Sequence, residues 1–262
     1  MAYNLNDKLV IAISSRALFD LEEENQIFEK DGLDAYYKYQ LENEDKSLKK
    51  GTGYRLVENI LKINSFFSSD ERQVEVIILS KNNAATSLRI TNAINDLKLD
   101  IIRSAWTSGT NISNYLKAFK VDLFLSADDN DVLNAIENGV AAAKILHSNE
   151  NIHNISNEQV RIAFDGDAVL FSEESELVYK NHGLEAFIEH EKENRNNPLE
   201  MGPFAKLLLT IAKIQAKFPT DKSPIRTALV TARSAPTHER VIKTFNVWGV
   251  RVDEAFFLGG TD

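Results

Sequence analysis

The chain has 262 residues, with 30 Lys and Arg against 39 Asp and Glu, and its formal net charge is −9. Its 43% hydrophobic and 26% charged residues are typical of a folded globular protein and exclude a mostly disordered chain. The acidic balance argues against nucleic acid as the main partner, no apolar run is long enough to span a membrane, and the absence of cysteine excludes disulfides and thiolate chemistry. Because the N-terminal residues do not resemble a signal peptide, we expect a cytoplasmic protein.

Short apolar runs alternate with longer amphipathic stretches along the chain. Buried strands are predicted at residues 9–13, 74–79, 121–125, 161–164 and 228–230, and helices at residues 54–63, 84–97, 132–146, 204–217 and 237–248. This alternation predicts an α/β fold with mainly parallel sheets. Each predicted strand ends in a cluster of polar residues, and ligands of open α/β sheets bind at the carboxyl ends of the strands. We therefore expect the chemistry at these clusters.

The second part of the chain repeats the first at a fixed spacing. Adding 151 to the residue number takes Ile11-Ala12 to Ile162-Ala163, and the same ungapped shift takes Gly32-Leu33 to Gly183-Leu184. Identities of this kind number about two dozen over about a hundred positions. The pattern predicts an internal duplication, with residues 1–150 as the first copy and residues 151–262 as the second. Two unrelated domains of the same class are the alternative.

In the second copy, the predicted strand at 161–164 runs directly into Asp165-Gly166-Asp167. A carboxylate at the tip of the strand, Asp165, can act as a nucleophile or a metal ligand, and Gly166 allows the backbone to turn tightly. Asp167 would face the same crevice, where it could donate a proton to a leaving group and then activate water. The alternative is that Asp-Gly is an ordinary turn.

A second polar cluster follows the predicted strand at 228–230. The hydroxyl of Thr231 and the backbone N–H groups after it would form a cradle for phosphate, with Ala232 inside the cradle. Arg233 could add a bidentate contact to the phosphate. The alternative is a capping threonine followed by a surface arginine.

Asp165-Gly166-Asp167-Ala168-Val169-Leu170-Phe171 after a strand, with a later apolar strand that ends in Thr231, resembles the haloacid dehalogenase superfamily of phosphotransferases. The whole chain more closely resembles the cytosolic 5′-nucleotidase type I family. The segments that carry this resemblance are 10–20, 39–42, 161–172, 184–192, 224–226 and 229–235. It implies two tandem haloacid dehalogenase-like (Rossmann-like) repeats with small helical caps at residues 32–44 and 183–194.

The resemblance also implies an activity, which is Mg²⁺-dependent hydrolysis of nucleoside 5′-monophosphates with AMP as the expected substrate. Asp165 would attack the phosphorus to form an aspartyl-phosphate, Asp167 would act as acid and then base, and Thr231 would hold the phosphoryl oxygens. Mg²⁺ would lie between Asp165, the backbone carbonyl of Asp167, the phosphate and a downstream acid. Three cap residues are candidates for contacts to the base or ribose, namely Phe187, His190 and Lys192.

The first copy departs from this pattern at the nucleophile. Ser14 stands at the position of Asp165 and Arg16 at that of Asp167, so we expect no hydrolysis there. Ser14, Ser15 and Arg16 would either bind an anion or only support the fold. The first copy does carry the later parts of the pattern, namely Ser80, Lys117 and Asp128-Asp129.

The second copy has Thr231 at the position of Ser80, but it ends before the counterparts of Lys117 and of the acidic pair. Adding 151 to the numbers of the acidic pair gives 279 and 280, beyond the last residue, so we expect the sequence to lack its C-terminus and part of its metal site. Two alternative functions remain. One is a non-catalytic nucleotide-binding or regulatory protein, and the other is a phosphatase of another small phosphate ester. The oligomeric state is not readable from the sequence.

Overall fold

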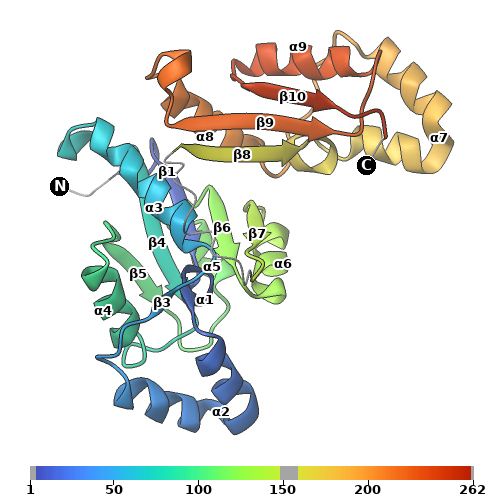
Figure 1. Cartoon of the computed structure of the whole chain (residues 1–262). Coiled ribbons are helices and arrows are strands. Elements are labelled where there is room, and N and C mark those ends of the chain that lie inside the picture. The colour runs from blue at the N-terminus through green and yellow to red at the C-terminus, as the bar shows by residue number, and fades with distance from the viewer. Residues whose placement is uncertain (1–3, 148–158, 261–262) are drawn as a thin grey trace. The chain divides into compact units, whose positions relative to one another are not determined.

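The computed structural model describes residues 4–147 and 159–260 of the chain, which divides into two units, Met1–Asn157 and Glu158–Asp262. The main sheet of the first unit has the strand order β5-β4-β1-β6-β7, and every neighbouring pair is parallel (Figure 1). The strands are β1 (Leu9–Ile13), β4 (Val74–Ser80), β5 (Arg103–Trp106), β6 (Leu123–Ser126) and β7 (Ala142–Lys144). All residues of β1 and β4 are buried, as expected for the central strands of a sheet covered on both faces.

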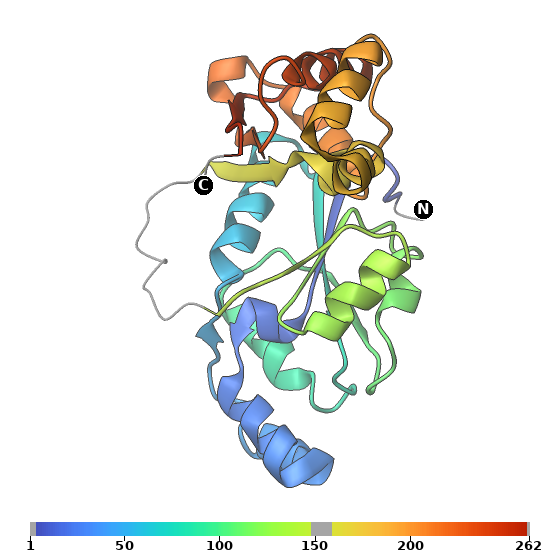
Figure 2. The same cartoon turned by 90° about the vertical axis from the view of Figure 1, so that its right-hand side faces the viewer.

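Helices and one short antiparallel pair of strands complete the first unit. They are α1 (Ser15–Leu18), β2 (Phe19–Asp20), α2 (Glu22–Glu42), β3 (Lys49–Lys50), α3 (Tyr54–Lys62), α4 (Leu88–Asp96), α5 (Ser113–Leu116) and α6 (Asp129–Glu137). Figures 1 and 2 show α2 projecting beyond the carboxyl ends of the strands, which is where the polar clusters lie. Within this unit α2 is therefore placed to cover a site at that end of the sheet.

The second unit has a smaller sheet. Its described strands, in the order β10-β9-β8, are all parallel to their neighbours, and this order matches β5-β4-β1 of the first unit. The elements are β8 (Val160–Asp165), α7 (Glu174–Glu193), α8 (Ala205–Gln215), β9 (Ile225–Thr231), α9 (His238–Trp248) and β10 (Glu254–Phe257). Asp165 at the end of β8 lies opposite Val230, so the ends of β8 and β9 are adjacent.

The predicted α/β class and the predicted strands at 9–13, 74–79, 121–125, 161–164 and 228–230 are confirmed, although β6 begins two residues later than expected. The predicted helix at 132–146 is wrong in its second half. It begins earlier, at Asp129, and ends at Glu137, because Gly139 adopts a φ of 71° that stops the helix, and the apolar residues after it form β7. The helix predicted at 84–97 begins only at Leu88.

Helices α2 and α7 share a kink at a glycine. Gly32 has φ 85° and ψ −175°, and Gly183 has φ 83° and ψ −177°, a region of backbone conformation that is open almost only to glycine. Each glycine divides its helix into two arms, and the predicted cap segments at 32–44 and 183–194 begin at these kinks. The same device at a spacing of 151 residues supports the repeat seen in the sequence.

The predicted shift without a gap is nevertheless wrong just after the first strand of each unit. In the first unit the N–H of Phe19 donates to the carbonyl of Ser15, four residues earlier. In the second unit the N–H of Phe171 donates to the carbonyl of Gly166, five residues earlier, in a single π-turn. The second unit therefore has one extra residue here, and Ala168 within the turn takes a positive φ of 58°.

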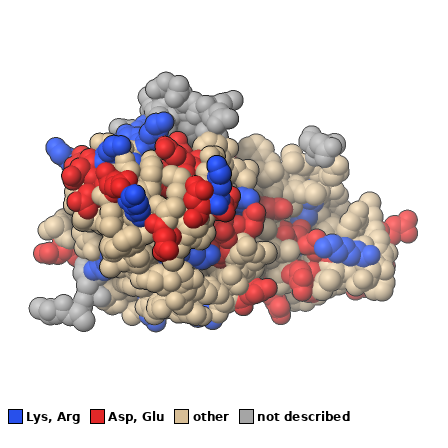
Figure 3. Space-filling model, turned by 90° about the horizontal axis from the view of Figure 1, so that it is seen from below, with Lys and Arg blue, Asp and Glu red and all other residues tan. Residues whose placement is uncertain are grey.

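The surface carries both signs of charge. On the face shown in Figure 3, acidic and basic side chains lie interspersed. Among the residues that the structure describes, no helix is both long enough and apolar enough to cross a bilayer.

Candidate functional site

The aspartate-rich segment lies at the carboxyl end of the second sheet. Asp165 is the last residue of β8, its side chain is exposed, and its Oδ1 accepts a hydrogen bond from the N–H of Gly166 at 2.6 Å. This bond caps the turn that follows and fixes the direction in which the strand ends. The result is an accessible carboxylate on a rigid strand, where it can act as a nucleophile or bind a cation.

Gly166 brings this turn against Thr231. A Cβ atom at Gly166 would lie 3.2 Å from Oγ1 of Thr231, so the Thr231 side chain would have to give way by a few tenths of an ångström. The Thr231 side chain is buried, and its Oγ1 accepts a hydrogen bond from the N–H of Arg233 at 3.2 Å. The structure thus brings together the two motifs singled out from the sequence, although 66 residues separate Asp165 and Thr231 in the chain.

Asp167 and Arg233 bind each other. Nε of Arg233 donates to Oδ2 of Asp167 at 2.8 Å and Nη2 donates to Oδ1 at 2.6 Å, which is a bidentate ion pair. The sequence predicts Asp167 as a proton donor in the crevice and Arg233 as a phosphate contact. In this structure the hydrogen-bonding atoms of Asp167 and Arg233 are engaged with each other. Either predicted role therefore requires the ion pair to open.

Glu191 on α7 anchors Arg233 from the other side. Its side chain is 0% exposed, and it accepts hydrogen bonds from Nη1 of Arg233 at 2.5 Å, Nη1 of Arg240 at 2.9 Å and Oγ of Ser175 at 2.8 Å. Burial by itself raises the pKa of Glu191, but the charge of Arg233 and the hydrogen bond of Ser175 outweigh it, so that the pKa lies below its ordinary value. Glu191 is therefore held as a buried carboxylate.

Burial and the neighbouring charges also act in opposite directions on the pKa of Arg233, whose side chain is 2% exposed. Burial lowers its pKa, but the hydrogen bonds and negative charges of Asp167 and Glu191 raise it further, and the pKa lies above its ordinary value. The guanidinium also lies over the ring of Phe187 at 5.3 Å from the centroid. Arg233 is thus a fixed cation next to the strand ends.

Neither Glu191 nor Arg240 is among the site residues predicted from the sequence. A signal existed in the repeat, because 151 residues earlier stand Gln40 and Arg89, and Arg89 is likewise buried. Of the cap residues that we did identify, Phe187 packs under Arg233 and His190 lies between Glu174 and Glu191, at 3.2 and 3.3 Å. Both belong to the ion-pair network, whereas Lys192 is exposed.

At the end of β8 the chain offers a cation one exposed carboxylate, that of Asp165. No group of three or more His, Asp or Glu side chains that could hold a metal ion lies in the described ranges 4–147 and 159–260. Mg²⁺ in phosphate-handling sites, however, is usually held by one or two carboxylates together with substrate phosphates and water. The exposed carboxylate of Asp165, beside the buried hydroxyl of Thr231, suits that kind of ion.

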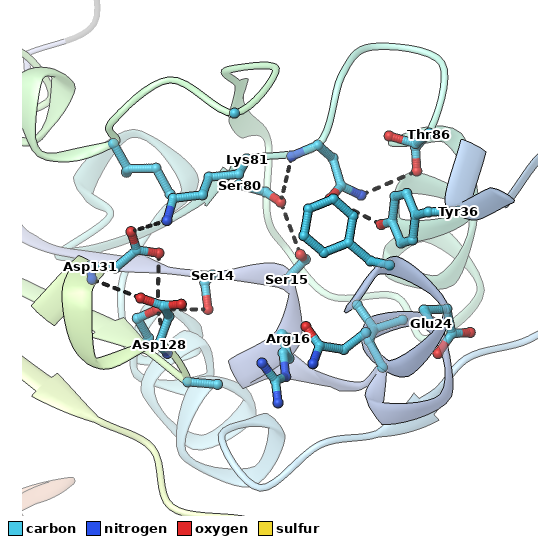
Figure 4. A pocket seen from close by; sticks show the side chains of 18 of the residues that line it. Ser14, Ser15, Arg16, Glu24, Tyr36, Ser80, Lys81, Thr86, Asp128 and Asp131 are labelled. Carbon is cyan, nitrogen blue, oxygen red and sulfur yellow. Dashed lines mark hydrogen bonds and ion pairs between the residues drawn. The ribbon is translucent and has the colours of Figure 1, made fainter. Parts of the chain in front are cut away.

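The first unit contains a cavity of about 490 Å³ at the carboxyl ends of β1, β4 and β6 (Figure 4). Ser14, Ser15 and Arg16 line it, as does Ser80, and the serine hydroxyls converge. Oγ of Ser15 lies 3.0 Å from Oγ of Ser80, and Oγ of Ser126 donates to Oγ of Ser14 at 3.4 Å. The residues that replace the aspartates in this unit therefore form the floor of a ligand-sized cavity.

The cavity is also lined by two basic side chains, each of which forms an ion pair with a carboxylate. Nζ of Lys81 lies 2.7 Å from Oδ1 of buried Asp131, and Arg16 makes two hydrogen bonds to Glu22, at 2.8 and 2.9 Å. The hydrogen bond to Glu22, more than offsetting burial, raises the pKa of Arg16. Asp128 also lines the cavity, where its Oδ1 accepts from the N–H of Asp131.

Two of the later residues singled out in the first copy lie elsewhere. Asp129 binds Lys144 at 2.7 Å, and neither Asp129 nor Lys117 is among the described residues that line the cavity. The predicted acidic pair is therefore divided, with Asp128 facing the cavity and Asp129 facing Lys144.

Comparison with known proteins matches the whole chain to one family. The family model described as 5′-nucleotidase matches residues 1–262. Human cytosolic 5′-nucleotidase 1B is 37% identical to the chain over 261 residues, which cover 96% of this chain and 43% of that protein. The chain thus spans less than half the length of this curated relative. No solved structure matches it.

Proposed function

The chain belongs to the 5′-nucleotidase family, and on that premise we propose that its second unit hydrolyses nucleoside 5′-monophosphates, with AMP as the expected substrate. The observation that carries this proposal is the exposed carboxylate of Asp165 at the end of β8, next to the buried hydroxyl of Thr231. A nucleophile beside a neutral oxyanion-binding group is what phosphoryl transfer to a protein carboxylate needs. The curated relative is named as cytosolic, which supports a cytoplasmic location.

The proposed reaction has two displacement steps. An oxygen of Asp165 attacks the phosphorus, the bond from phosphorus to the 5′-oxygen breaks, and Asp167 donates a proton to the departing 5′-oxygen. A water molecule then attacks the phosphorus and gives a proton to Asp167, and the acyl-phosphate bond breaks. The products are the nucleoside and inorganic phosphate, and the carboxylate of Asp165 is restored.

The side chain of Asp165 and the backbone carbonyl of Asp167 would hold Mg²⁺. Its charge would reduce the repulsion between an anionic nucleophile and an anionic phosphate. The hydroxyl of Thr231 and the backbone N–H of Ala232 would bind the phosphoryl oxygens. These groups are neutral donors, so they favour the spread of charge over the phosphoryl oxygens without neutralising the nucleophile.

Arg233 controls when Asp167 can act. Both oxygens of Asp167 accept hydrogen bonds from Arg233, so Asp167 can donate a proton to a leaving oxygen only after Arg233 releases it. A substrate phosphate beside Thr231 would compete with Asp167 for the same N–H groups. In this proposal the arriving phosphate takes these N–H groups while Glu191 keeps the guanidinium in place, and Asp167 is freed.

We assign both units to the haloacid dehalogenase-like fold, as tandem repeats of which the second is catalytic. The matching order of β10-β9-β8 and β5-β4-β1 supports this assignment, as do the glycine kinks at Gly32 and Gly183. The first unit has Ser14 in place of Asp165 and therefore lacks the nucleophile.

The test is phosphate release from AMP, IMP and ribose 5-phosphate, with and without Mg²⁺. We expect Asp165→Asn to abolish release from AMP, because the amide is a poor nucleophile. Asp221→Asn, which changes another exposed aspartate of the second unit, should retain the rate of the unmodified chain. An active Asp165→Asn variant would show that the nucleophile is misassigned, and faster release from ribose 5-phosphate than from both nucleotides would favour a phosphatase of another small ester.

A further inference from the structure

We propose that the first unit holds a second ligand site, which binds a phosphomonoester carrying an aromatic ring, such as a nucleoside monophosphate, without hydrolysing it. The site is the cavity of about 490 Å³ at the ends of β1, β4 and β6 (Figure 4). That volume lies within the range of small-molecule sites, roughly 300–1,000 Å³. The site is separate from the proposed catalytic site in the second unit.

The floor of the cavity can receive a phosphate group. Four serine hydroxyls meet there, each at least nine-tenths buried, and they bond to one another in pairs: Ser15 with Ser80, and Ser14 with Ser126. A hydroxyl can rotate its hydrogen and donate to an anion in place of a neighbouring hydroxyl. Buried hydroxyls at the bottom of a cavity are thus donors that a ligand oxygen can recruit.

Two cations lie beside these hydroxyls, while the acids that face the cavity have partners. The side chains of Lys81 and Arg16 are 42% and 32% exposed, and each forms an ion pair with one carboxylate. The acidic residues lining the cavity are Glu24, Asp128 and Asp131, which bind Arg89, the first turn of α6 and Lys81, respectively. Because an ammonium has three N–H groups and a guanidinium five, Lys81 and Arg16 retain donors for a phosphate.

Aromatic side chains line the other end. Phe28 and Tyr36, one on each arm of α2, meet edge to face with their centroids 6.0 Å apart, and Phe28 is 48% exposed. The Tyr36 hydroxyl lies 3.2 Å from Oδ1 of Asn82, which fixes the ring. A flat aromatic ligand in the cavity can therefore stack against Phe28, which is about half exposed.

The comparison with the second unit shows why this space is open. Adding 151 to the number of Asn82 gives Arg233, and adding 151 to that of Tyr36 gives Phe187. In the second unit the long side chain of Arg233 covers the ring of Phe187, whereas the shorter Asn82 in the first unit lies beside Tyr36. The replacement of arginine by asparagine leaves room for a ligand.

The same residues exclude hydrolysis by the proposed route. Ser14 occupies the place of the carboxylate nucleophile, and its Oγ accepts hydrogen bonds from the N–H of Ala17 and from Ser126. No histidine is among the described residues that line the cavity, so a general base of that type does not activate Ser14. A phosphomonoester would be bound intact.

The test measures binding to the full chain carrying Asp165→Asn, which is expected not to consume the ligand. Hydrogen–deuterium exchange of peptides covering residues 80–87 and 108–112 reports on the cavity alone, while AMP, ribose 5-phosphate and inorganic phosphate are titrated separately. We expect AMP to protect both peptides, and Lys81→Gln to weaken its apparent affinity about tenfold or more, since a charge-assisted contact is lost. Lys62→Gln is the matched control, because Lys62 is 43% exposed and ion-paired but lies on α3.

A second variant tests the aromatic end of the site and does not depend on the first. Phe28→Ala should weaken AMP about threefold to tenfold and leave inorganic phosphate unchanged. The proposal is overturned if AMP protects neither peptide, or if Lys81→Gln and Phe28→Ala both bind AMP as the parent does. If inorganic phosphate protected the two peptides as strongly as AMP does, the proposal that the cavity binds an aromatic ring would be overturned. Phosphate release by the second unit is measured separately, so the two proposals can fail independently.

Discussion

Replacing Glu191 by glutamine should destabilise the second unit by about 3 kcal/mol. The side chain of Glu191 is fully buried and compensates two buried arginines, Arg233 and Arg240, whose side chains are 2% and 4% exposed. Removing one partner of a buried ion pair costs about 3–5 kcal/mol, because the remaining charge is left without compensation. Glutamine preserves the shape and one acceptor oxygen for Ser175, and Arg233 keeps Asp167, so we expect the lower end of that range.

The assay must report on the second unit alone, because two units need not unfold together. The chain has two tryptophans, Trp106 in the first unit and Trp248 in the second. In a Trp106→Phe background, fluorescence of Trp248, whose ring lies 5.7 Å from that of Phe171, follows urea unfolding of the second unit. Glu176→Gln, which breaks an exposed pair with Lys180 on the same helix, is the control and should cost about 0.5 kcal/mol or less.

A compensating change sharpens the test. At the corresponding positions of the first unit, Glu24 and Gln40 replace the pair Ser175 and Glu191, and Glu24 binds the buried Arg89 at 2.5 Å. Adding Ser175→Glu to Glu191→Gln should therefore restore a carboxylate facing the arginine and recover at least about 1 kcal/mol. The reasoning would be refuted if Glu191→Gln cost no more than Glu176→Gln.

Two further predictions concern stability. Because the pKa of Glu191 is lowered in the folded chain, its contribution is fully present above the ordinary value of 4.5 and is lost as the pH falls through the folded pKa. Unfolding followed at Trp248 from about pH 6 to about pH 3 should thus lose stability more steeply in the parent than in Glu191→Gln, and equal slopes would contradict this. Gly202→Ala should cost about 1–3 kcal/mol in the same assay, because its Cβ would lie 2.6 Å from the carbonyl oxygen of Val169. Gly249→Ala, where the Cβ meets open space, should cost only about 1 kcal/mol for its positive φ, and a larger loss than at Gly202 would contradict the steric argument.

The strands with apolar runs were predictable from the sequence, the edge strand β8 among them, whereas the other edge strands, β5, β7 and β10, were not. β1 and β4 are fully buried, so their apolar, β-branched runs are visible without any structure. β5 (Arg103–Trp106) and β10 (Glu254–Phe257) lie at sheet edges and are partly exposed, and their mixed composition gives no comparable signal. β7 (Ala142–Lys144) was not predicted because three residues are too few to show a hydrophobic period.

At the candidate site, the sequence predicted which segments meet but not how their side chains pair. Parallel strands end at one edge of a sheet, and this alone brings Asp165 and Thr231 together. The ion pair of Asp167 with Arg233 depends on the reach of a side chain from a distant segment, which spacing does not encode. Glu191 was missed because a glutamate among charged neighbours on a helix looks like part of a solvated face, although its side chain is buried.

The extra residue in the turn after β8 limits how the two units can exchange roles. Replacing Ser14 and Arg16 by aspartate would supply the missing carboxylates but would leave a four-residue turn, with Phe19 bonded to Ser15, where the second unit has five. The backbone there would then keep the tighter turn of the first unit and would lack the positive φ that Ala168 adopts in the second. Under the proposed function, the two substitutions alone would therefore not rebuild the catalytic turn. An inserted residue would be needed as well, so the backbone distinguishes the two units more firmly than the side chains do.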